Sequence, residues 1–153
     1  MKQTWRAVRE LIGDRPEVFG IDADESVLAA LKVMAEKNVG ALMVFSGGRP
    51  AGIVSERDYA RKVEVFDKTA AGTKVREIMT SEVIYVSPAD DAYACLVLMR
   101  KHRVRHLPVM EGGRVVGVLS TRNVVEEVIH EDEARIRDLE VERLRMTTNT
   151  GTY

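Results

Sequence analysis

The residues best suited to chemistry lie in two heptapeptides of one type. Residues 52–58 read Gly-Ile-Val-Ser-Glu-Arg-Asp, and residues 117–123 read Gly-Val-Leu-Ser-Thr-Arg-Asn. Ser55 and Asp58 have the spacing of a capping box, in which the serine oxygen accepts a hydrogen bond from a free amide at the start of a helix. A single occurrence of this motif would need no role beyond that structural one.

The repetition of the motif favours a binding role in addition. Each copy has a glycine before the serine and keeps an arginine, Arg57 or Arg122. Free amides at a helix N-terminus attract anions such as phosphate. An acidic side chain one turn into the helix can accept hydrogen bonds from a ribose diol, and glycine lets a ligand approach the backbone. The two motifs therefore predict binding of a phosphorylated ribose compound as well as helix capping.

Both motifs belong to a longer internal repeat. A shift of 65 positions places residues 17–63 on residues 82–128 without a gap, with identical residues at fifteen positions. A run of about 47 residues is near the lower limit for a self-sufficient core. We therefore expect the two copies to bury their apolar faces against each other as one pseudo-symmetric unit. A ligand site at the seam would then be built twice.

A basic cluster occurs in the second copy only. Residues 100–106 read Arg-Lys-His-Arg-Val-Arg-His. The first cations of this run suit the C-terminal end of a helix, but Arg105 and His106 come after the expected helix, beside an apolar strand. The first copy has Gly40 and Ala41 in their place, so the fold does not require charge there. We predict a phosphate or another anion near Arg105 and His106.

Each copy predicts the element order strand, helix, strand, strand, helix. Capping residues precede an apolar stripe of helical spacing, and Gly-Gly pairs between the later strands suit hairpin turns. The second helix of each copy is expected to start at Ser55 or Ser120. The predicted strands cover residues 18–21, 41–45 and 51–54, and then 83–86, 107–110 and 115–119.

The segments outside the repeat add two short helices, a linker and a charged tail. Apolar spacing predicts one short helix near residues 5–12 and another at 75–80. After Ile129 the chain is highly charged, which predicts a solvated helix ending near Met146 and then a frayed polar tail. That helix either lies lightly on the domain or meets a partner. The resulting division is 8–66 for the first repeat, 67–74 for the linker, 75–130 for the second repeat, and 131–153 for the charged helix and tail.

The composition excludes several classes of protein. A formal charge of −1 argues against a strongly basic nucleic-acid-binding protein. The single cysteine, Cys95, rules out a disulfide framework and a cysteine-rich zinc site, and its place in an apolar helical pattern predicts a buried residue. The three histidines lack metal-ligand spacing, so we expect no metal. No segment has the roughly 18 apolar residues of a membrane span, and no secretory signal follows the N-terminus. We expect a cytoplasmic protein.

These features together resemble a known family. Paired repeats of this length with the Gly-x-x-Ser-x-x-Asp motif, Leu-Pro-Val at 107–109, Gly-Gly turns and Val-Arg-Glu-Ile-Met-Thr at 75–80 are similar to a cystathionine-β-synthase-type (CBS) domain pair, or Bateman module, in particular a small stand-alone bacterial one. The resemblance covers residues 8–129. It implies an α/β (α+β) fold of tandem βαββα repeats related by a pseudo-two-fold axis. It also implies a homodimer and a cleft for AMP, ADP, ATP, NAD(H) or S-adenosylmethionine.

The resemblance also assigns site residues, with the serine and the acid of one repeat facing the strand of the other. In one site Asp58 would hold the ribose, Ser55 would lie near phosphate and Arg57 would add a phosphate contact. The mirrored site has Asn123 in place of the usual aspartate, which predicts weaker bonds to the diol and two unequal sites. The first site is completed by Ile84, Val104, Arg105, His106 and Leu107. The second contains Ser120, Arg122 and Asn123, facing Phe19, Gly40, Ala41 and Leu42.

The function that fits best is a non-enzymatic sensor of adenosine nucleotides, with AMP as the leading ligand, that signals energy or redox state to an effector protein. An enzyme is less consistent with the sequence, because no Ser-His-Asp or paired-carboxylate arrangement is evident. A structural or adaptor module with a vestigial cleft remains an alternative, as does a binder of S-adenosylmethionine. The partly basic cleft also leaves RNA binding as a weaker alternative, which is disfavoured because aromatic residues are only 5% of the chain.

Overall fold

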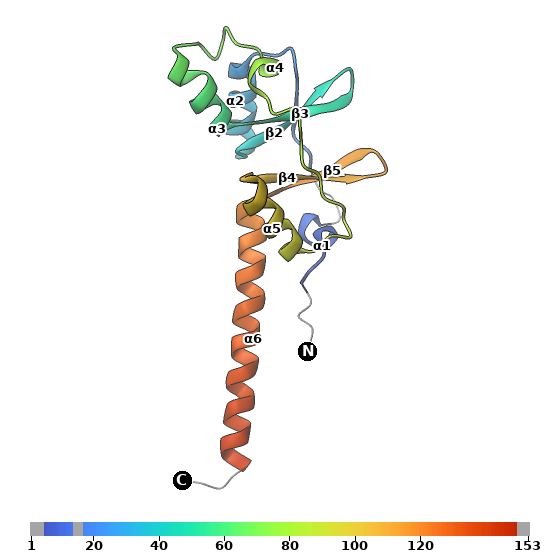
Figure 1. Ribbon diagram of the computed structural model, residues 1–153, viewed down its shortest axis with the longest axis vertical. Helices are drawn as coiled ribbons and strands as arrows, with labels where there is room; N and C mark the ends of the chain where they lie inside the picture. The colour runs from blue at the N-terminus through green and yellow to red at the C-terminus, as the bar shows by residue number, and fades with distance from the viewer. Residues whose placement is uncertain (1–4, 14–16, 150–153) are drawn as a thin grey trace.

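The computed structural model of this 153-residue chain describes residues 5–13 and 17–149, with side chains as far as residue 142. Its elements follow the repeat (Figure 1). The first half contains α1 (Val8–Ile12), β1 (Gly20–Asp22), α2 (Val27–Lys37), β2 (Ala41–Ser46), β3 (Arg49–Ser55), α3 (Glu56–Lys62) and the 3₁₀ turn η1 (Glu64–Phe66). The second half contains α4 (Val75–Ile78), α5 (Ala92–His102), β4 (His106–Glu111), β5 (Arg114–Ser120) and α6 (Thr121–Asn149).

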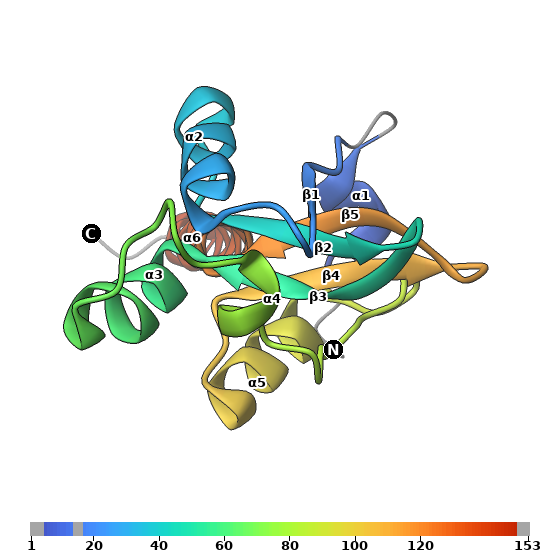
Figure 2. The same ribbon diagram turned by 90° about the horizontal axis from the view of Figure 1, so that it is seen from above.

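Two matching hairpins form the centre of the molecule. Strands β2 and β3 pair from Ala41 opposite Ser55, and β4 and β5 pair from His106 opposite Ser120, which is the same register 65 residues on. Both turns use a Gly-Gly pair with φ between 58° and 78°, the left-handed region that a hairpin turn of this type requires. The predicted hairpins are therefore confirmed. They lie next to each other, with helices on the outer sides (Figures 1 and 2).

The helix that precedes each hairpin begins at a capping residue, as predicted, and ends at a residue in the left-handed conformation. The Ser26 hydroxyl accepts a hydrogen bond from the amide of Ala29 at 3.0 Å, and the Asp91 carboxylate accepts one from the amide of Ala94 at 2.8 Å. The helices then end at Asn38 and Arg103, which have φ of 55° and 54°. A left-handed residue at this position stops the helix and turns the chain. The next residues therefore enter β2 or β4 at equivalent points.

The first strand of the second repeat is missing, so the prediction for residues 83–86 was wrong. In the first repeat, β1 runs parallel to β2, and two flanking bonds join the amide of Met43 to the Phe19 carbonyl and the amide of Ala23 to the Phe45 carbonyl. The residues equivalent to Met43 and Ala23 are Pro108 and Pro88. Proline has no amide hydrogen to donate. Pairing is therefore reduced to a single bridge between Val86 and Val109.

The two short helices are exchanged between the halves. The Val8 amide of α1 donates to the Asp90 carbonyl at 2.7 Å, and the Val75 amide of α4 donates to the Glu25 carbonyl at 2.8 Å. Val8 accordingly packs in the core of the second repeat, and Val75 packs in the core of the first. Each core is thus completed by the helix that precedes the other repeat along the chain. This exchange ties the halves into one unit.

The exchange also explains the glycines that precede the two serine motifs. A β-carbon on Gly52 would lie 2.6 Å from the Thr80 carbonyl oxygen, and one on Gly117 would lie 3.0 Å from the side chain of Ile12. The close approach expected of a ligand at these glycines is thus made by the chain itself. The segment that follows α4 and the last residue of α1 occupy that space.

The last helix, α6, is continuous from the second serine motif through the charged region. It packs on α5 and β5 at its start and then extends away from the domain (Figure 1). Ile136 and Leu139 are 55% and 59% exposed on its outer part. The helix continues to Asn149, past the predicted end near Met146, because no glycine or proline interrupts it before Gly151. The remaining predicted tail, 150–153, lies outside the described residues. No helix in the described part of the chain is long and apolar enough to cross a membrane.

Candidate ligand clefts

Two clefts open at the seam between the repeats. We call the smaller one, of about 100 Å³, the basic cleft, and the larger one, of about 420 Å³, the large cleft. Each contains a serine motif from one repeat and a strand edge from the other. The basic cleft is lined by six of the predicted residues, Ser55, Arg57, Ile84, Val104, Arg105 and His106. The large cleft is lined by Phe19, Gly40, Ala41, Ser120, Arg122 and Asn123, and also by His106.

Three predicted residues do not line either cleft. Leu42 and Leu107 are 1% and 0% exposed, and they pack in the two hydrophobic cores. Successive side chains of a strand point to opposite faces, so these leucines turn inward, away from the cleft, after Ala41 and His106. Asp58 is the third, and its carboxylate bonds to Ser55 and Lys62 within its own repeat.

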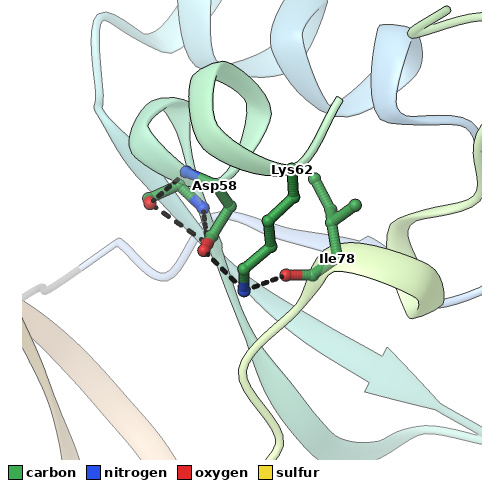
Figure 3. A network of polar contacts seen from close by, with 4 residues as sticks. Asp58, Lys62 and Ile78 are labelled. Atoms are coloured by element: carbon green, nitrogen blue, oxygen red, sulfur yellow. Dashed lines mark hydrogen bonds and ion pairs between the residues drawn. The ribbon is translucent and has the colours of Figure 1, made fainter. Parts of the chain in front are cut away.

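Asp58 is held by a capping box and a lysine (Figure 3). One carboxylate oxygen accepts from the Ser55 amide at 2.9 Å and the Ser55 hydroxyl at 3.1 Å, while the Asp58 amide donates to the Ser55 oxygen. The other oxygen lies 3.0 Å from Nζ of Lys62, which also donates to the Ile78 carbonyl at 2.8 Å. A ribose diol would have to share this second oxygen with Lys62 or displace it.

Asn123 repeats the box without the cation. Its side-chain oxygen accepts from the Ser120 hydroxyl at 2.8 Å and the Ser120 amide at 3.1 Å. The position equivalent to Lys62 is Glu127, which pairs with Arg6 at 3.4 Å. A carboxylate at 123 would therefore lie one turn from another carboxylate, an unfavourable spacing on a helix. Because its oxygen is already engaged, Asn123 can offer a ligand mainly its NH₂ group.

The amides at the start of the two helices contribute less than the sequence indicated. The Glu56 amide donates to the Gly40 carbonyl at 3.1 Å, and the Thr121 amide donates to the Arg105 carbonyl at 2.8 Å. The next capped amides, at Asp58 and Asn123, donate to their serines. Recognition of an anion in either cleft must therefore rely chiefly on charged side chains.

His106 lies between the two clefts and lines both of them. Its imidazole is 3.9 Å from the point that a β-carbon on Gly40 would occupy, so it reaches the strand edge of the first repeat. Burial, and then the neighbouring Arg105 guanidinium, lower the pKa of His106 below its ordinary value. The sequence assigned this residue to one site only. The small residues Gly40 and Ala41, opposite a large imidazole, were the signal that it could reach across.

Charged residues that the predicted site set did not include also line the clefts. Arg103 contributes to the basic cleft, and Glu82 is on its rim. The large cleft contains Glu17, the repeat equivalent of Glu82, and Glu126. Glu126 forms an ion pair with Arg122 at 3.0 Å. The sequence repeat already shows that Glu17 and Glu82 are identical residues at equivalent positions. The position of Glu126 at the cleft, by contrast, depends on how α6 passes it.

A comparison with protein families decides what kind of domain this is. The model of the CBS domain matches residues 8–65 and again residues 75–130. The chain belongs to the CBS-domain family.

Solved structures of other CBS proteins are similar over most of this CBS pair. A signal-transduction protein with CBS domains from Burkholderia ambifaria, described as putative, has 41% identity and a TM-score of 0.78, with 82% of this chain and 95% of that chain covered. A CBS domain protein from Pyrobaculum aerophilum, solved in complex with AMP, has 25% identity and a TM-score of 0.69, with 77% and 89% covered.

A curated relative is longer than this CBS pair. A mitochondrial CBS domain-containing protein of Arabidopsis thaliana is 39% identical over 121 residues, which are 76% of this chain and 59% of that protein. The CBS pair thus spans about three fifths of that relative. These matches support the observed fold of paired α+β repeats, which confirms the fold class expected from the sequence.

Neither a metal site nor a reactive thiol is found in the described part of this CBS pair. No group of three or more His, Cys, Asp or Glu residues there could hold a metal ion. Cys95 is fully buried in the second core. Burial, with Asp90 and Asp91 nearby, raises the pKa of its thiol to about 11. The prediction of a buried Cys95 is confirmed, and such a thiol is a poor nucleophile because the thiolate is the reactive form.

Proposed function

We propose that this CBS pair is a non-enzymatic regulatory module that binds adenosine nucleotides in the clefts between its repeats and signals their presence to a partner protein. The observation that carries the proposal is the make-up of the clefts. Each one joins the serine motif of one repeat to the strand edge of the other, beside apolar wall residues. A ligand that bridges the two sides would favour one arrangement of the halves, which is how binding could be signalled.

AMP is the first ligand to test, and ADP, ATP and NAD(H) follow. The Pyrobaculum aerophilum CBS protein was solved with AMP, and the clefts here have groups that suit the parts of such a molecule. Ile84 and Val104 provide an apolar wall for a base, and Arg57 and Arg105 provide cations for phosphate. The large cleft lies within the range of about 300–1,000 Å³ typical of small-molecule sites.

The basic cleft is smaller than that range and must widen to accept a nucleoside. The Asp58–Lys62 ion pair is the contact that would change. In the proposed complex, ribose hydroxyls replace Lys62 at the carboxylate, and the released ammonium can turn toward phosphate. Asp58 would keep its capping bonds to Ser55 throughout, because these use the other carboxylate oxygen.

Thermal melting with and without AMP, ADP, ATP, NADH and adenosine tests the proposal. A ligand that binds only the native state stabilises it by about 2.7 kcal/mol at a hundred times its dissociation constant. A raised melting temperature with at least one nucleotide, and none with ribose 5-phosphate alone, is the expected result. The absence of any shift across the panel would instead support an adaptor module with a vestigial cleft. Recovery of unchanged nucleotide after incubation tests the non-enzymatic part.

The proposal includes a homodimer formed through the repeat helices. Leu28 of α2 and Tyr93 of α5 occupy equivalent positions in the two repeats, and both are exposed apolar residues. Exposed apolar side chains at equivalent positions could pair across a two-fold axis between two chains. Light scattering should give twice the 17.1 kDa mass of the chain. The double variant with Leu28→Glu and Tyr93→Glu should give the mass of one chain. The cytoplasm, where adenosine nucleotides are abundant, is the location that we propose for the module.

A further inference from the structure

Arginines outnumber acids among the described residues that line the basic cleft. Arg57, Arg103 and Arg105 line it, against the single acid Glu82. Among the residues that the structure describes, none of these three arginines forms an ion pair. Guanidinium groups without carboxylate partners are suited to phosphate, which they can bind through two parallel hydrogen bonds.

The positive surface continues beyond the basic cleft. A neighbouring recess of about 260 Å³ is lined by the same three arginines, together with Arg100 and the Thr121 side of α6. A ligand whose base and ribose lie in the basic cleft could therefore extend a second or third phosphate into the recess without leaving the arginines. A single phosphate would use only part of this surface.

The large cleft has the opposite charge balance. Glu17 and Glu126 line it, and Arg122, the one arginine that lines it among the residues that the structure describes, is paired with Glu126 at 3.0 Å. His106 adds no fixed charge, because burial and Arg105 lower its pKa. Lys37 lies over the Phe19 ring, 5.5 Å from its centroid, and does not line the cleft. A phosphate in this cleft would meet two carboxylates and an arginine that is already paired with one of them.

The walls of the large cleft can nevertheless hold a nucleoside. Phe19, Val39 and Val118 supply apolar surface, while Ser120 and Asn123 supply polar groups at one end. The two carboxylates would attract a positively charged group and would tolerate a neutral one that donates hydrogen bonds. The cleft is therefore suited to adenosine compounds that do not carry phosphate.

We propose that the two clefts separate adenosine ligands by charge, an inference that rests on the proposed function. The basic cleft and its arginine recess bind a nucleoside with two or more phosphates. The large cleft binds an adenosine compound with a neutral or cationic 5′ substituent. The module then reports on two classes of metabolite at once, and each binds its own cleft.

Calorimetric titration of the full chain tests this division, with ATP and AMP as anionic probes and with adenosine and S-adenosylmethionine as neutral and cationic probes. For the wild type we expect one equivalent of ATP per chain, bound more tightly than AMP, and one equivalent of S-adenosylmethionine. ATP and S-adenosylmethionine should bind together without competing. Raising the salt concentration should weaken ATP binding most, because exposed charges are screened.

Two variants assign the probes to the clefts. Arg105→Gln should weaken ATP by about tenfold or more and leave S-adenosylmethionine unchanged. Glu126→Arg should weaken S-adenosylmethionine by about tenfold and create a second equivalent of AMP binding. The matched controls are Arg114→Gln in the exposed β5 hairpin and Glu133→Arg two turns along α6, neither of which lines a cleft. Each control changes the net charge by the same amount and should bind as the wild type does.

The possible failures are distinguishable. If AMP or ATP fills both clefts of the wild type with equal affinity, the division by charge is wrong and the proposed function stands. The division is equally wrong if Glu126→Arg and Glu133→Arg have the same effect, since net charge would then explain it. If no adenosine compound binds at all, the proposed function fails, and the division fails with it.

Discussion

The two repeats build the same hairpin and the same serine cap, yet they surround clefts of different size and charge. Gly47, Gly48 and Ser55 have identical equivalents in the second repeat, and these residues make the turn and the cap. Arg105 and His106, by contrast, replace Gly40 and Ala41. The comparison shows that positions shared by the repeats set the fold, whereas positions that differ set the charge of each cleft.

The differences between the repeats are also coupled to one another. Asp58 has Lys62 one turn away, and Asn123 has Glu127 at the same spacing. Each pair avoids two like charges on neighbouring turns. The loss of the acid in the second motif therefore accompanies a change of its helical neighbour, and the second motif has no counterpart of the Asp58–Lys62 ion pair.

The largest expected effects test whether the repeats have equivalent cores. Met34 and Met99 occupy the same repeat position and are both buried in their cores. Met34→Ala and Met99→Ala should each lower the free energy of unfolding by about 2–5 kcal/mol. Urea denaturation monitored by circular dichroism would measure both. A much smaller loss at Met99 would show that the second core, which lacks a full first strand, repacks more easily.

The next largest effect concerns Asp58, whose carboxylate has no counterpart in the second motif. Asp58→Ala should weaken nucleotide binding in the basic cleft by about 1.5–3 kcal/mol, the range for a hydrogen bond to a charged group. Asp58→Asn is the matched control for folding, because Asn123 shows that asparagine can form the same capping bonds. Calorimetric titration with nucleotide should show weaker binding in both variants than in the wild type. Full affinity in Asp58→Asn would mean that Asp58 acts through the cap and not on the ribose.

The serine caps should differ by a smaller amount. Ser55→Ala and Ser120→Ala each remove a capping bond, which typically costs about 1 kcal/mol of folding free energy. We expect the larger loss at Ser55, because its hydroxyl and amide bond to a carboxylate that is 16% exposed, whereas Ser120 bonds to a neutral amide. Thermal unfolding of the two variants side by side measures the difference. Equal losses would show that the charge of Asp58 adds nothing to its cap.

The smallest expected effect is a dependence of stability on pH through His106. Its pKa is lowered in the native protein, first by burial and then by Arg105. As the pH falls below about 6.5, the ordinary value, the unfolded chain takes up this proton before the native one does. The contribution of His106 is therefore intact above that pH and is lost as the pH falls through the native pKa.

The variant His106→Ala isolates this effect, because it introduces the residue found at the equivalent position of the first repeat, Ala41. Melting temperatures of the wild type and the variant should diverge between pH 7 and pH 5, with the wild type losing more stability on acidification. NADH binding should strengthen over the same range if its phosphates lie near His106, since a nearby anion favours the protonated imidazole. Parallel pH curves for the two proteins would show that His106 does not titrate in this range.

The sequence by itself determined the repeat, the hairpins, the helix caps and the family. It also predicted most of the residues that line the clefts between the repeats. These signals are local, because a Gly-Gly turn or a Ser-x-x-Asp cap depends on residues within a few positions of one another. One local signal was not used: Pro88 and Pro108 stand where Ala23 and Met43 donate strand hydrogen bonds, which could have excluded the strand at 83–86.

Only the tertiary structure decided the rest. The exchange of α1 and α4, the bond from Lys62 to the Ile78 carbonyl, and the reach of His106 into both clefts depend on segments that are far apart along the chain or on opposite sides of the seam. The charge balance of each cleft depends likewise on how α6 and the strand edges pass one another. Such contacts follow from the packing of whole elements, and the spacing of residues within one element does not encode them.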